Sequence, residues 1–237
     1  MSFLSCIIVV GGLTLTVYGV STYFRLSGLL AESSALVKNA LPYEQQGATD
    51  APTVLFIGDS TGVGVGAKPE ESLAGRYGAE YPTWNVVNLS VSGRRTAELL
   101  PVLKNLETGR YERVIIQVGG NDITYFSPLE QLKKDIADVL AEAKRVGKKV
   151  TLISCGNVGN APIFPRPVAF LWSKRTLAVR SIFMEAATKA GVSHVDLYRE
   201  GADDPFAREP LRYHARDLFH PSGEGYGLWY EDLKKSL

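Results

Sequence analysis

The chain has 237 residues, and 26 Lys and Arg against 25 Asp and Glu give a formal net charge of +1. This balance argues against a dedicated nucleic-acid-binding protein, because such proteins usually carry a strongly basic patch. Apolar residues at 45% and charged residues at 22% exclude a disordered chain. The chain has two cysteines and three histidines without metal-ligand spacing, which predicts neither a disulfide framework nor a metal site.

The first segment, Met1–Phe24, contains no charged side chain. As a helix it would be roughly 35 Å long, enough to cross a hydrocarbon core of about 30 Å. No Lys or Arg precedes the apolar run, which favours a membrane anchor over a cleaved signal peptide. We therefore predict a membrane-anchored protein with a single N-terminal span, on either side of the membrane. The alternatives are a secreted or periplasmic protein after signal cleavage and a buried hydrophobic helix.

The leucines that follow the apolar run have helical spacing. Leu26, Leu29, Leu36 and Leu41 lie near one face, which predicts an amphipathic continuation of the first helix. Residues 42–52 are rich in turn-forming and polar residues and read as a linker. The predicted organisation is an N-terminal helix over 1–41, a linker over 42–52 and one domain over 53–237.

Strands and helices alternate along this domain. Leu129–Val146 has one apolar stripe, and Ser127-Pro128 and Gly147 bound it, so it predicts an amphipathic helix. Regular alternation of strands and helices predicts an α/β fold of three layers, with a five-stranded parallel sheet between helices. The five predicted strands are Thr53–Ile57, Val86–Leu89, Val114–Val118, Val150–Ser154 and Ser193–Leu197.

Polar residues directly follow several of these strands, and ligands bind at the carboxyl ends of strands in open α/β sheets. Ser60 follows the first strand and is either a helix N-cap or a nucleophile that needs a base. His220 is the best candidate base, because Asp217 lies three residues earlier and could hold the imidazole in the required tautomer. A surface Asp–His pair is the alternative. His214 lacks such an acid, and His194 lies inside a predicted strand.

A nucleophilic serine also needs hydrogen-bond donors for the oxyanion of the intermediate. We expect these donors to be the N–H of Ser60, the N–H of Gly93 and the side-chain amide of Asn121. Gly93 would allow close approach of the backbone to a substrate, but it also fits an ordinary turn. Asn121 also fits an Asx turn. Asp59 and Asp122 beside these residues are expected to orient the backbone as acceptors.

Together these blocks resemble the SGNH hydrolase superfamily, also called GDSL esterases and lipases. Gly58–Ser60, Gly93, Gly119–Asp122 and Asp217–His220 match its four blocks in order, with Thr61 where the best-known pattern has leucine. The resemblance implies a flavodoxin-like sheet and hydrolysis of carboxylic esters without a metal or cofactor. It implies Ser60, Asp217 and His220 as the catalytic residues. Substrates in this superfamily include lipid, short-acyl and thioester compounds, and carbohydrate O-deacetylation is the alternative.

Two other classes share the first motif. Gly58–Gly62 also satisfies the G-x-S-x-G pattern of α/β-hydrolases, although their acid and histidine normally come from separate loops. Gly62, Gly64 and Ala67 fit a dinucleotide fingerprint, so a non-enzymatic nucleotide-binding protein stays open. No acid ends the second strand, where that fingerprint would place one.

A further segment is a candidate for substrate binding. Phe164, Arg166 and Trp172 follow the fourth strand, and we expect them to line an acyl pocket or touch a membrane. Prolines at 162, 165 and 167 predict a loop instead of a regular helix. The alternative is a loop that packs on the domain as additional core.

Overall fold

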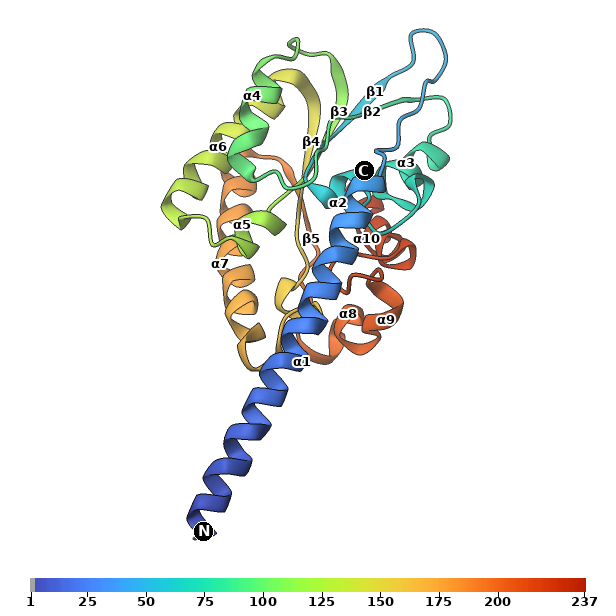
Figure 1. The fold of residues 1–237 in the computed structure, drawn as a ribbon. Helices are drawn as coiled ribbons and strands as arrows, with labels where there is room; N and C mark the ends of the chain where they lie inside the picture. Colours follow the sequence, from blue (N-terminus) through green and yellow to red (C-terminus); the bar gives the residue numbers. More distant parts are fainter. Residues whose placement is uncertain (1–2) are drawn as a thin grey trace.

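Five parallel strands form the centre of the computed structural model, which describes the backbone of residues 3–237 and the side chains of residues 16–237 (Figure 1). The strand order is β2-β1-β3-β4-β5. Each predicted strand is present, so the predicted α/β class and parallel sheet are confirmed. The strands are β1 (Thr53–Gly58), β2 (Asn85–Asn88), β3 (Tyr111–Gln117), β4 (Gly147–Ser154) and β5 (Ser193–Asp196).

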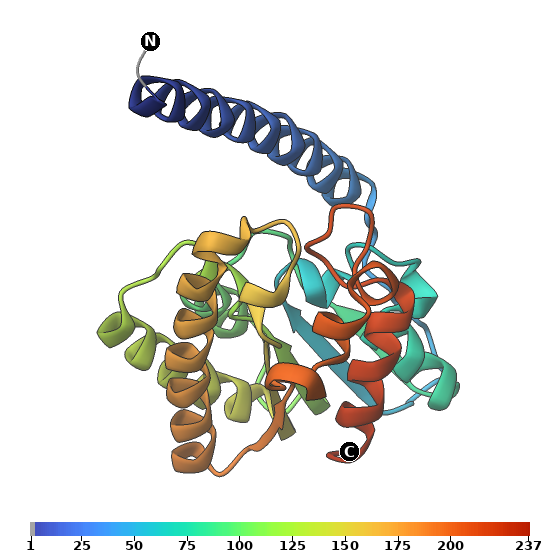
Figure 2. The same cartoon turned by 90° about the horizontal axis from the view of Figure 1, so that it is seen from below.

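Helices cover both faces of the sheet (Figure 2). Successive residues of a strand point to opposite faces, so β1 sends Leu55 and Ile57 to one core and Val54 and Phe56 to the other. The first core packs against α4, α6 and α7, and the second against α3 and α10. These helices are α3 (Leu73–Glu80), α4 (Leu99–Lys104), α6 (Leu129–Val146), α7 (Arg166–Ala190) and α10 (Gly223–Lys234).

Short helices lie in the connections between these elements. The α-helices among them are α2 (Ser60–Val63), α5 (Gly120–Thr124), α8 (Pro205–Arg208) and α9 (Pro210–Tyr213). The 3-10 helices are η1 (Pro69–Glu71), η2 (Thr96–Glu98), η3 (Val158–Asn160) and η4 (Gly201–Asp203).

The helix α6 has the predicted bounds. Its apolar stripe, which includes Leu132, Ile136 and Leu140, is buried in the first core. Gly147 ends the helix, and its N–H donates to the carbonyl of Ala143. The sequence pattern is sufficient to predict this helix, because its apolar spacing and its terminal glycine agree with the observed packing.

The helix α7 corrects one prediction. The three prolines were expected to exclude a helix, but α7 begins at Arg166, one residue before Pro167. A proline in the first turn removes an N–H that has no partner within the helix, so it is tolerated there. Trp172 therefore lies on a helix and not on a loop.

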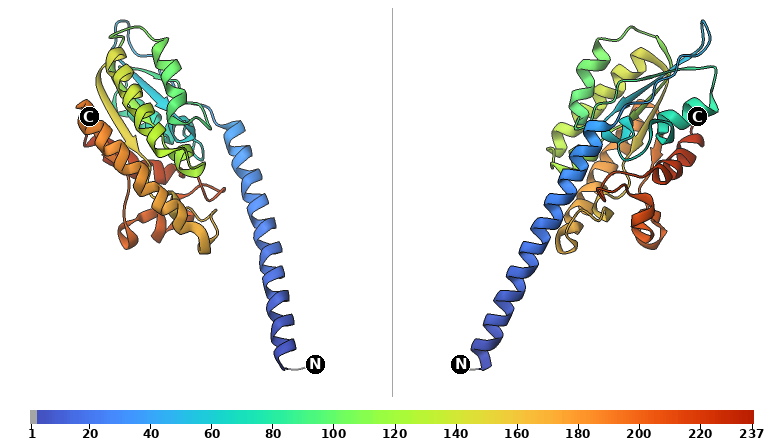
Figure 3. Two further views of the ribbon diagram at one scale, coloured as in Figure 1. Left: turned by 90° about the vertical axis from the view of Figure 1, so that its left-hand side faces the viewer. Right: turned by 45° about the vertical axis from the view of Figure 1, so that its right-hand side comes forward.

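The N-terminal helix α1 (Phe3–Asn39) runs beside the domain and projects beyond it (Figure 3). In its second half Leu26, Leu29 and Leu36 are partly buried, as the predicted stripe requires, whereas Leu41 beyond the helix is 69% exposed. The following segment touches the domain, because Gln45 pairs with Val86 at the edge of the sheet.

The predicted membrane span falls largely on residues whose side chains lie outside the described part of the chain. In the part that is described, no helix has the length and apolarity that crossing a membrane requires. The division into 1–41, 42–52 and 53–237 stays a prediction.

Candidate active site

Ser60 is the first residue of α2, directly beyond the end of β1. The turn needs glycine at Gly58, because a Cβ there would lie 1.9 Å from the carbonyl oxygen of Gln117. Asp59 is the N-cap of α2, since its Oδ1 accepts from the N–H of Thr61 at 2.9 Å and from its hydroxyl at 2.7 Å. The capping function therefore belongs to Asp59, and the hydroxyl of Ser60 points elsewhere.

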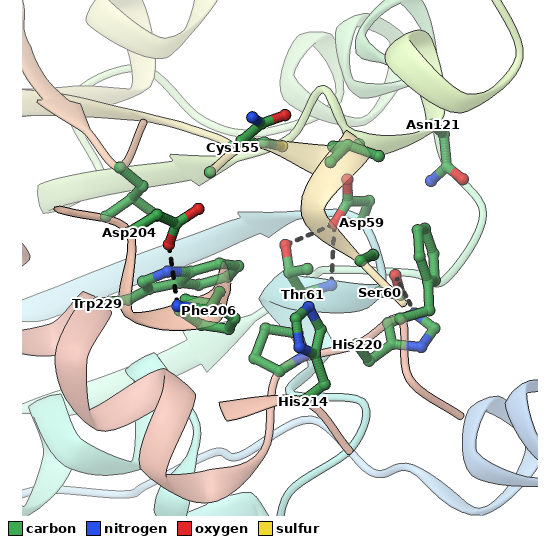
Figure 4. Close-up of a pocket in the computed structure, with 18 residues that line it drawn as sticks. Asp59, Ser60, Thr61, Asn121, Cys155, Asp204, Phe206, His214, His220 and Trp229 are labelled. Atoms are coloured by element: carbon green, nitrogen blue, oxygen red, sulfur yellow. Dashed lines mark hydrogen bonds between the residues drawn. The ribbon is translucent and has the colours of Figure 1, made fainter. Parts of the chain in front are cut away.

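The hydroxyl of Ser60 lies 2.9 Å from Nε2 of His220, 160 positions away in the chain (Figure 4). On the other side of the ring, Nδ1 lies 2.6 Å from Oδ2 of Asp217. All three side chains are buried. The structure thus brings together the serine, the histidine and the aspartate that the sequence singled out.

The geometry fixes the proton positions. Burial raises the pKa of Asp217, but hydrogen bonds from His220 and from two backbone N–H groups outweigh it and lower the pKa overall. The ionised carboxylate only accepts hydrogen bonds, so Nδ1 of His220 carries the proton. Nε2 is then the acceptor for the hydroxyl of Ser60, which is the tautomer that a general base requires.

Two devices hold the loop that carries His220. Oδ1 of Asp217 accepts from the N–H of Phe219 at 3.1 Å and of His220 at 3.0 Å. Gly66 packs beneath the loop, where a Cβ would come within 2.4 Å of the carbonyl oxygen of Pro221. The aspartate therefore orients both the imidazole and the backbone that bears it.

The three predicted oxyanion donors come from neighbouring strand ends. The N–H of Ser60 belongs to the first turn of α2, where N–H groups have no partner within the helix. Asn121 lines the same cavity as Ser60, and one of its amide protons goes to the carbonyl of Arg94 at 3.0 Å, which leaves the second. Gly93 adjoins Arg94 with φ of 87° and open space around its Cβ position, but it is not among the residues that line the cavity.

A cavity of about 80 Å³ adjoins Ser60 and His220 (Figure 4). Its walls are largely apolar, and a few polar groups interrupt them. Most of these residues belong to no sequence motif, because they follow β4 and β5 and meet only through the fold. The cavity residues without such a motif include Cys155, Leu197, Asp204, Phe206 and Trp229.

The remaining histidines have separate environments. His214 also lines the cavity, and its Nδ1 lies 3.0 Å from the carbonyl oxygen of Pro210, so Nδ1 is the protonated nitrogen. Burial lowers the pKa of His214, which keeps the ring neutral with Nε2 as an acceptor. His194 lies in β5 with Nε2 3.1 Å from the hydroxyl of Ser154, outside the cavity.

The predicted substrate residues do not line this cavity. Phe164 and Trp172 stack with ring centroids 4.2 Å apart, and Trp172 also packs against the first core. Phe164 meets Phe219 edge-on at 5.9 Å. Phe164 and Arg166 line a separate groove beside α1. The alternative of additional core thus describes Trp172.

Packing explains the glycines of the nucleotide-like pattern. A Cβ on Gly62 would lie 2.4 Å from Oγ of Ser90, and Gly64 ends α2 with φ of 93°. Close packing against Ser90 thus accounts for Gly62, and the left-handed turn that ends α2 accounts for Gly64. In the part of the chain that the structure describes, no group of three or more His, Cys, Asp or Glu residues could hold a metal ion.

The two other acidic residues of the motifs act as acceptors. Oδ2 of Asp122 accepts from the N–H of Thr96 at 3.0 Å and from its hydroxyl at 2.7 Å. Burial raises the pKa of Asp59, more than its hydrogen bonds with Thr61 lower it. Both residues thus accept backbone N–H groups, as expected: Asp59 orients the turn that carries Ser60, and Asp122 holds the segment at Thr96.

Comparisons with known proteins agree with this geometry. No curated protein matches the chain in sequence. Among solved structures, a lipolytic protein of the G-D-S-L family from Veillonella parvula is 15% identical with a TM-score of 0.61, covering 78% of this chain and 97% of its own. A phospholipase A1 from Streptomyces albidoflavus is 14% identical with a TM-score of 0.59, covering 79% and 100%. A variant of an acetyl-xylooligosaccharide esterase from Geobacillus is 17% identical with a TM-score of 0.57, covering 81% and 95%.

These structures share the fold with the present chain. The sequence profile of the GDSL-like lipase/acylhydrolase family matches residues 56–228, which include every predicted catalytic and oxyanion residue. The chain therefore belongs to the GDSL-like lipase/acylhydrolase family and is a carboxylic ester hydrolase.

Proposed function

We propose that the chain hydrolyses carboxylic esters through an acyl-enzyme on Ser60. The observation that carries this proposal is a pair of buried hydrogen bonds. One joins Ser60 Oγ to His220 Nε2, and the other joins His220 Nδ1 to Asp217. His220 accepts the hydroxyl proton as Ser60 attacks the acyl carbon, and then gives this proton to the leaving alcohol. Water, activated by the same imidazole, releases the acyl group as a carboxylic acid.

The negative charge of the tetrahedral intermediate needs donors on the opposite side of the reacting carbon. We assign this role to the N–H of Ser60, the N–H of Gly93 and the free amide proton of Asn121. Asn121 is supported by its position in the wall of the cavity and by its bond to Arg94, which uses only one of its two amide protons. Each such donor contributes about 2.7–4 kcal/mol to stabilisation of the transition state.

The walls of the cavity favour an aliphatic acyl or alcohol group next to the ester. Leu197, Phe206 and Trp229 provide apolar surface, and a volume of about 80 Å³ suits a short group. Carbohydrate O-deacetylation is the second candidate, since an acetyl group would also fit. Neighbours in the fold include both a phospholipase and an acetyl-xylooligosaccharide esterase, so the fold does not choose between the two.

We also propose that the N-terminal segment holds the enzyme at a membrane. The absence of charge from Met1 to Phe24 supports this, and secretion after signal cleavage is the alternative. Fractionation of cells that express the full chain tests it. An anchored protein stays with the membrane in high salt, whereas a soluble, shortened chain would contradict the anchor.

Hydrolysis of p-nitrophenyl butyrate by the full chain tests the proposed mechanism. Ser60→Ala and His220→Ala should each lower kcat by at least about 10⁴-fold without loss of the folded state. His194→Ala is the matched control, because this histidine contacts Ser154 outside the cavity, and it should retain its rate. Turnover that survives both active-site substitutions would exclude this mechanism.

A further inference from the structure

A groove of about 780 Å³ lies between α1 and the start of α7. Tyr18, Ser21 and Arg25 of α1 form one wall. The segment from Gly159 to Ser173 forms the facing wall, and Ala207 and Pro210 of α8 and α9 close one side. Figure 1 shows α1 passing across this end of the domain. The wall from α1 lies outside the residues 56–228 that match the family profile.

This groove adjoins the catalytic cavity. Ala161 lines both spaces. Phe164 lines the groove and meets Phe219 edge-on at 5.9 Å, and the ring of Phe219 meets that of His220 at 5.0 Å. A long molecule with its ester at Ser60 could therefore continue past Ala161 and Phe164 into the groove.

Polar contacts hold α1 against the loops that surround the active site. The guanidinium of Arg25 donates to the carbonyl of Pro162 in the facing wall. About two helical turns further on, Glu32 forms an ion pair at 3.0 Å with Arg216, the residue next to Asp217. The wall from α1 thus contacts both the segment that precedes α7 and the loop that carries Asp217 and His220.

The chemistry of the lining suits an amphiphile. Tyr18, Phe164 and Phe170 supply aromatic surface, and Phe170 is 52% exposed. Arg25 and Arg166 supply positive charge, and no carboxylate is among the described residues of the lining. Hydrocarbon would cover the aromatic surface, and an anionic group would pair with the arginines.

We propose that this groove binds the hydrocarbon chain of an anionic lipid ester whose ester group lies at Ser60, so that α1 is part of the substrate site. The proposal rests on the ester hydrolase function given above. It assigns chain-length selectivity to residues of α1 and α7, and headgroup selectivity to Arg166.

Filling the groove from either wall tests the proposal in the full chain. Ser21→Trp blocks it from α1, and Val20→Trp is the matched control, since Val20 is 50% exposed and outside the lining. Ala169→Trp blocks it from α7, with the exposed Leu171→Trp as its control. The substrates are p-nitrophenyl palmitate and p-nitrophenyl butyrate in the same neutral detergent.

Both groove variants should lower kcat/KM for the palmitate at least about tenfold, the loss expected when about two methylenes are no longer buried. Their kcat/KM for the butyrate, and both rates of the control variants, should stay within about twofold. Equal losses on the two esters, or no loss on either, would overturn the groove proposal. Ser21 lies on an exposed face of α1, so we expect Ser21→Trp to fold. This variant alone can test the proposal if Ala169→Trp unfolds the domain.

The role of charge has its own test. Arg166→Gln should lower the rate on palmitoyl-lysophosphatidylglycerol relative to palmitoyl-lysophosphatidylcholine about tenfold, because charge-assisted bonds are stronger than neutral ones. Arg208→Gln, an exposed change outside the lining, should leave the ratio unchanged. An unchanged ratio in both variants would remove the anionic headgroup from the proposal. Wild-type chain that cleaves neither palmitate nor butyrate would instead refute the ester hydrolase function itself.

Discussion

The substitution Asp217→Asn tests how the site prepares its base. Asp217 is fully buried, and its Oδ1 accepts two backbone N–H groups while Oδ2 faces Nδ1 of His220. An asparagine of the same shape would keep its carbonyl oxygen toward the two backbone donors. Its NH₂ would then donate to Nδ1, which moves the ring proton to Nε2. In that tautomer the imidazole cannot accept the proton of Ser60.

The expected loss exceeds that of one hydrogen bond. Loss of a charge-assisted bond alone would cost about 1.5–3 kcal/mol. Inversion of the tautomer adds to this, and the same change in other Ser-His-Asp enzymes lowers kcat about 10⁴-fold, or about 5.4 kcal/mol. Steady-state hydrolysis of p-nitrophenyl butyrate measures it, with thermal unfolding to establish that the variant folds. The exposed Asp203→Asn is the matched control and should keep its rate.

A result for Asp217→Asn within tenfold of the wild-type kcat would refute this reasoning. It would mean that the contact at 2.6 Å does not set the tautomer of His220. Loss of rate together with loss of the folded state would show that Asp217 acts through the loop backbone.

Three further predictions concern neighbouring residues. Asn121→Ala should lower kcat about 10²–10³-fold with little change in KM, as measured in steady-state assays. A loss of kcat below tenfold would show that Asn121 is not an oxyanion donor. The pKa of Asp59 is raised by burial above its ordinary value of 3.8, so the stability of the wild type falls as pH rises through the folded pKa. The free energy of unfolding of Asp59→Asn minus that of the wild type should therefore increase with pH above about 4. Unfolding curves at several pH values measure this difference, and a difference that does not change with pH would contradict the prediction. Gly66→Ala and Gly109→Ala both place a side chain at positive φ, but only Gly66 has neighbours near the added Cβ. Gly66→Ala should thus lower kcat and also lose about 1–3 kcal/mol of stability, whereas Gly109→Ala should lose stability alone. If the two variants have the same kcat, the loop of His220 tolerates the change and this prediction is wrong.

The sheet could be predicted from sequence because β1 to β4 each contain a short run with β-branched residues. The amino ends of β3 and β4 were missed, since Glu112, Arg113, Lys148 and Lys149 carry charges that read as loop. These residues lie where the strands extend beyond the apolar core, and an ion pair between Lys148 and Glu112 at 2.7 Å joins them. A local sequence pattern indicates burial, and these four residues are partly buried or exposed, although Tyr111 and Gly147 beside them are buried.

The candidate site was predictable to the extent that its residues follow strand ends. Ser60 and Asn121 follow predicted strands within a few residues, and His220 follows an acid by three residues. These spacings indicate a functional role. Asp204 carries no such signal, although its Oδ2 accepts from Asn160 at 2.6 Å and it lines the catalytic cavity. Its contact joins segments 44 positions apart, which only the fold brings together.

The most direct test of the central claim is intact-mass analysis of the full chain after reaction with a fluorophosphonate, followed by peptide mapping. A serine activated by the buried relay to His220 should take up one phosphonyl group on Ser60 and lose esterase activity in proportion. Ser60→Ala should take up none, and His220→Ala should react far more slowly. A phosphonyl group on another residue that accompanies the loss of activity, or an unmodified Ser60 in inactivated enzyme, would contradict the account.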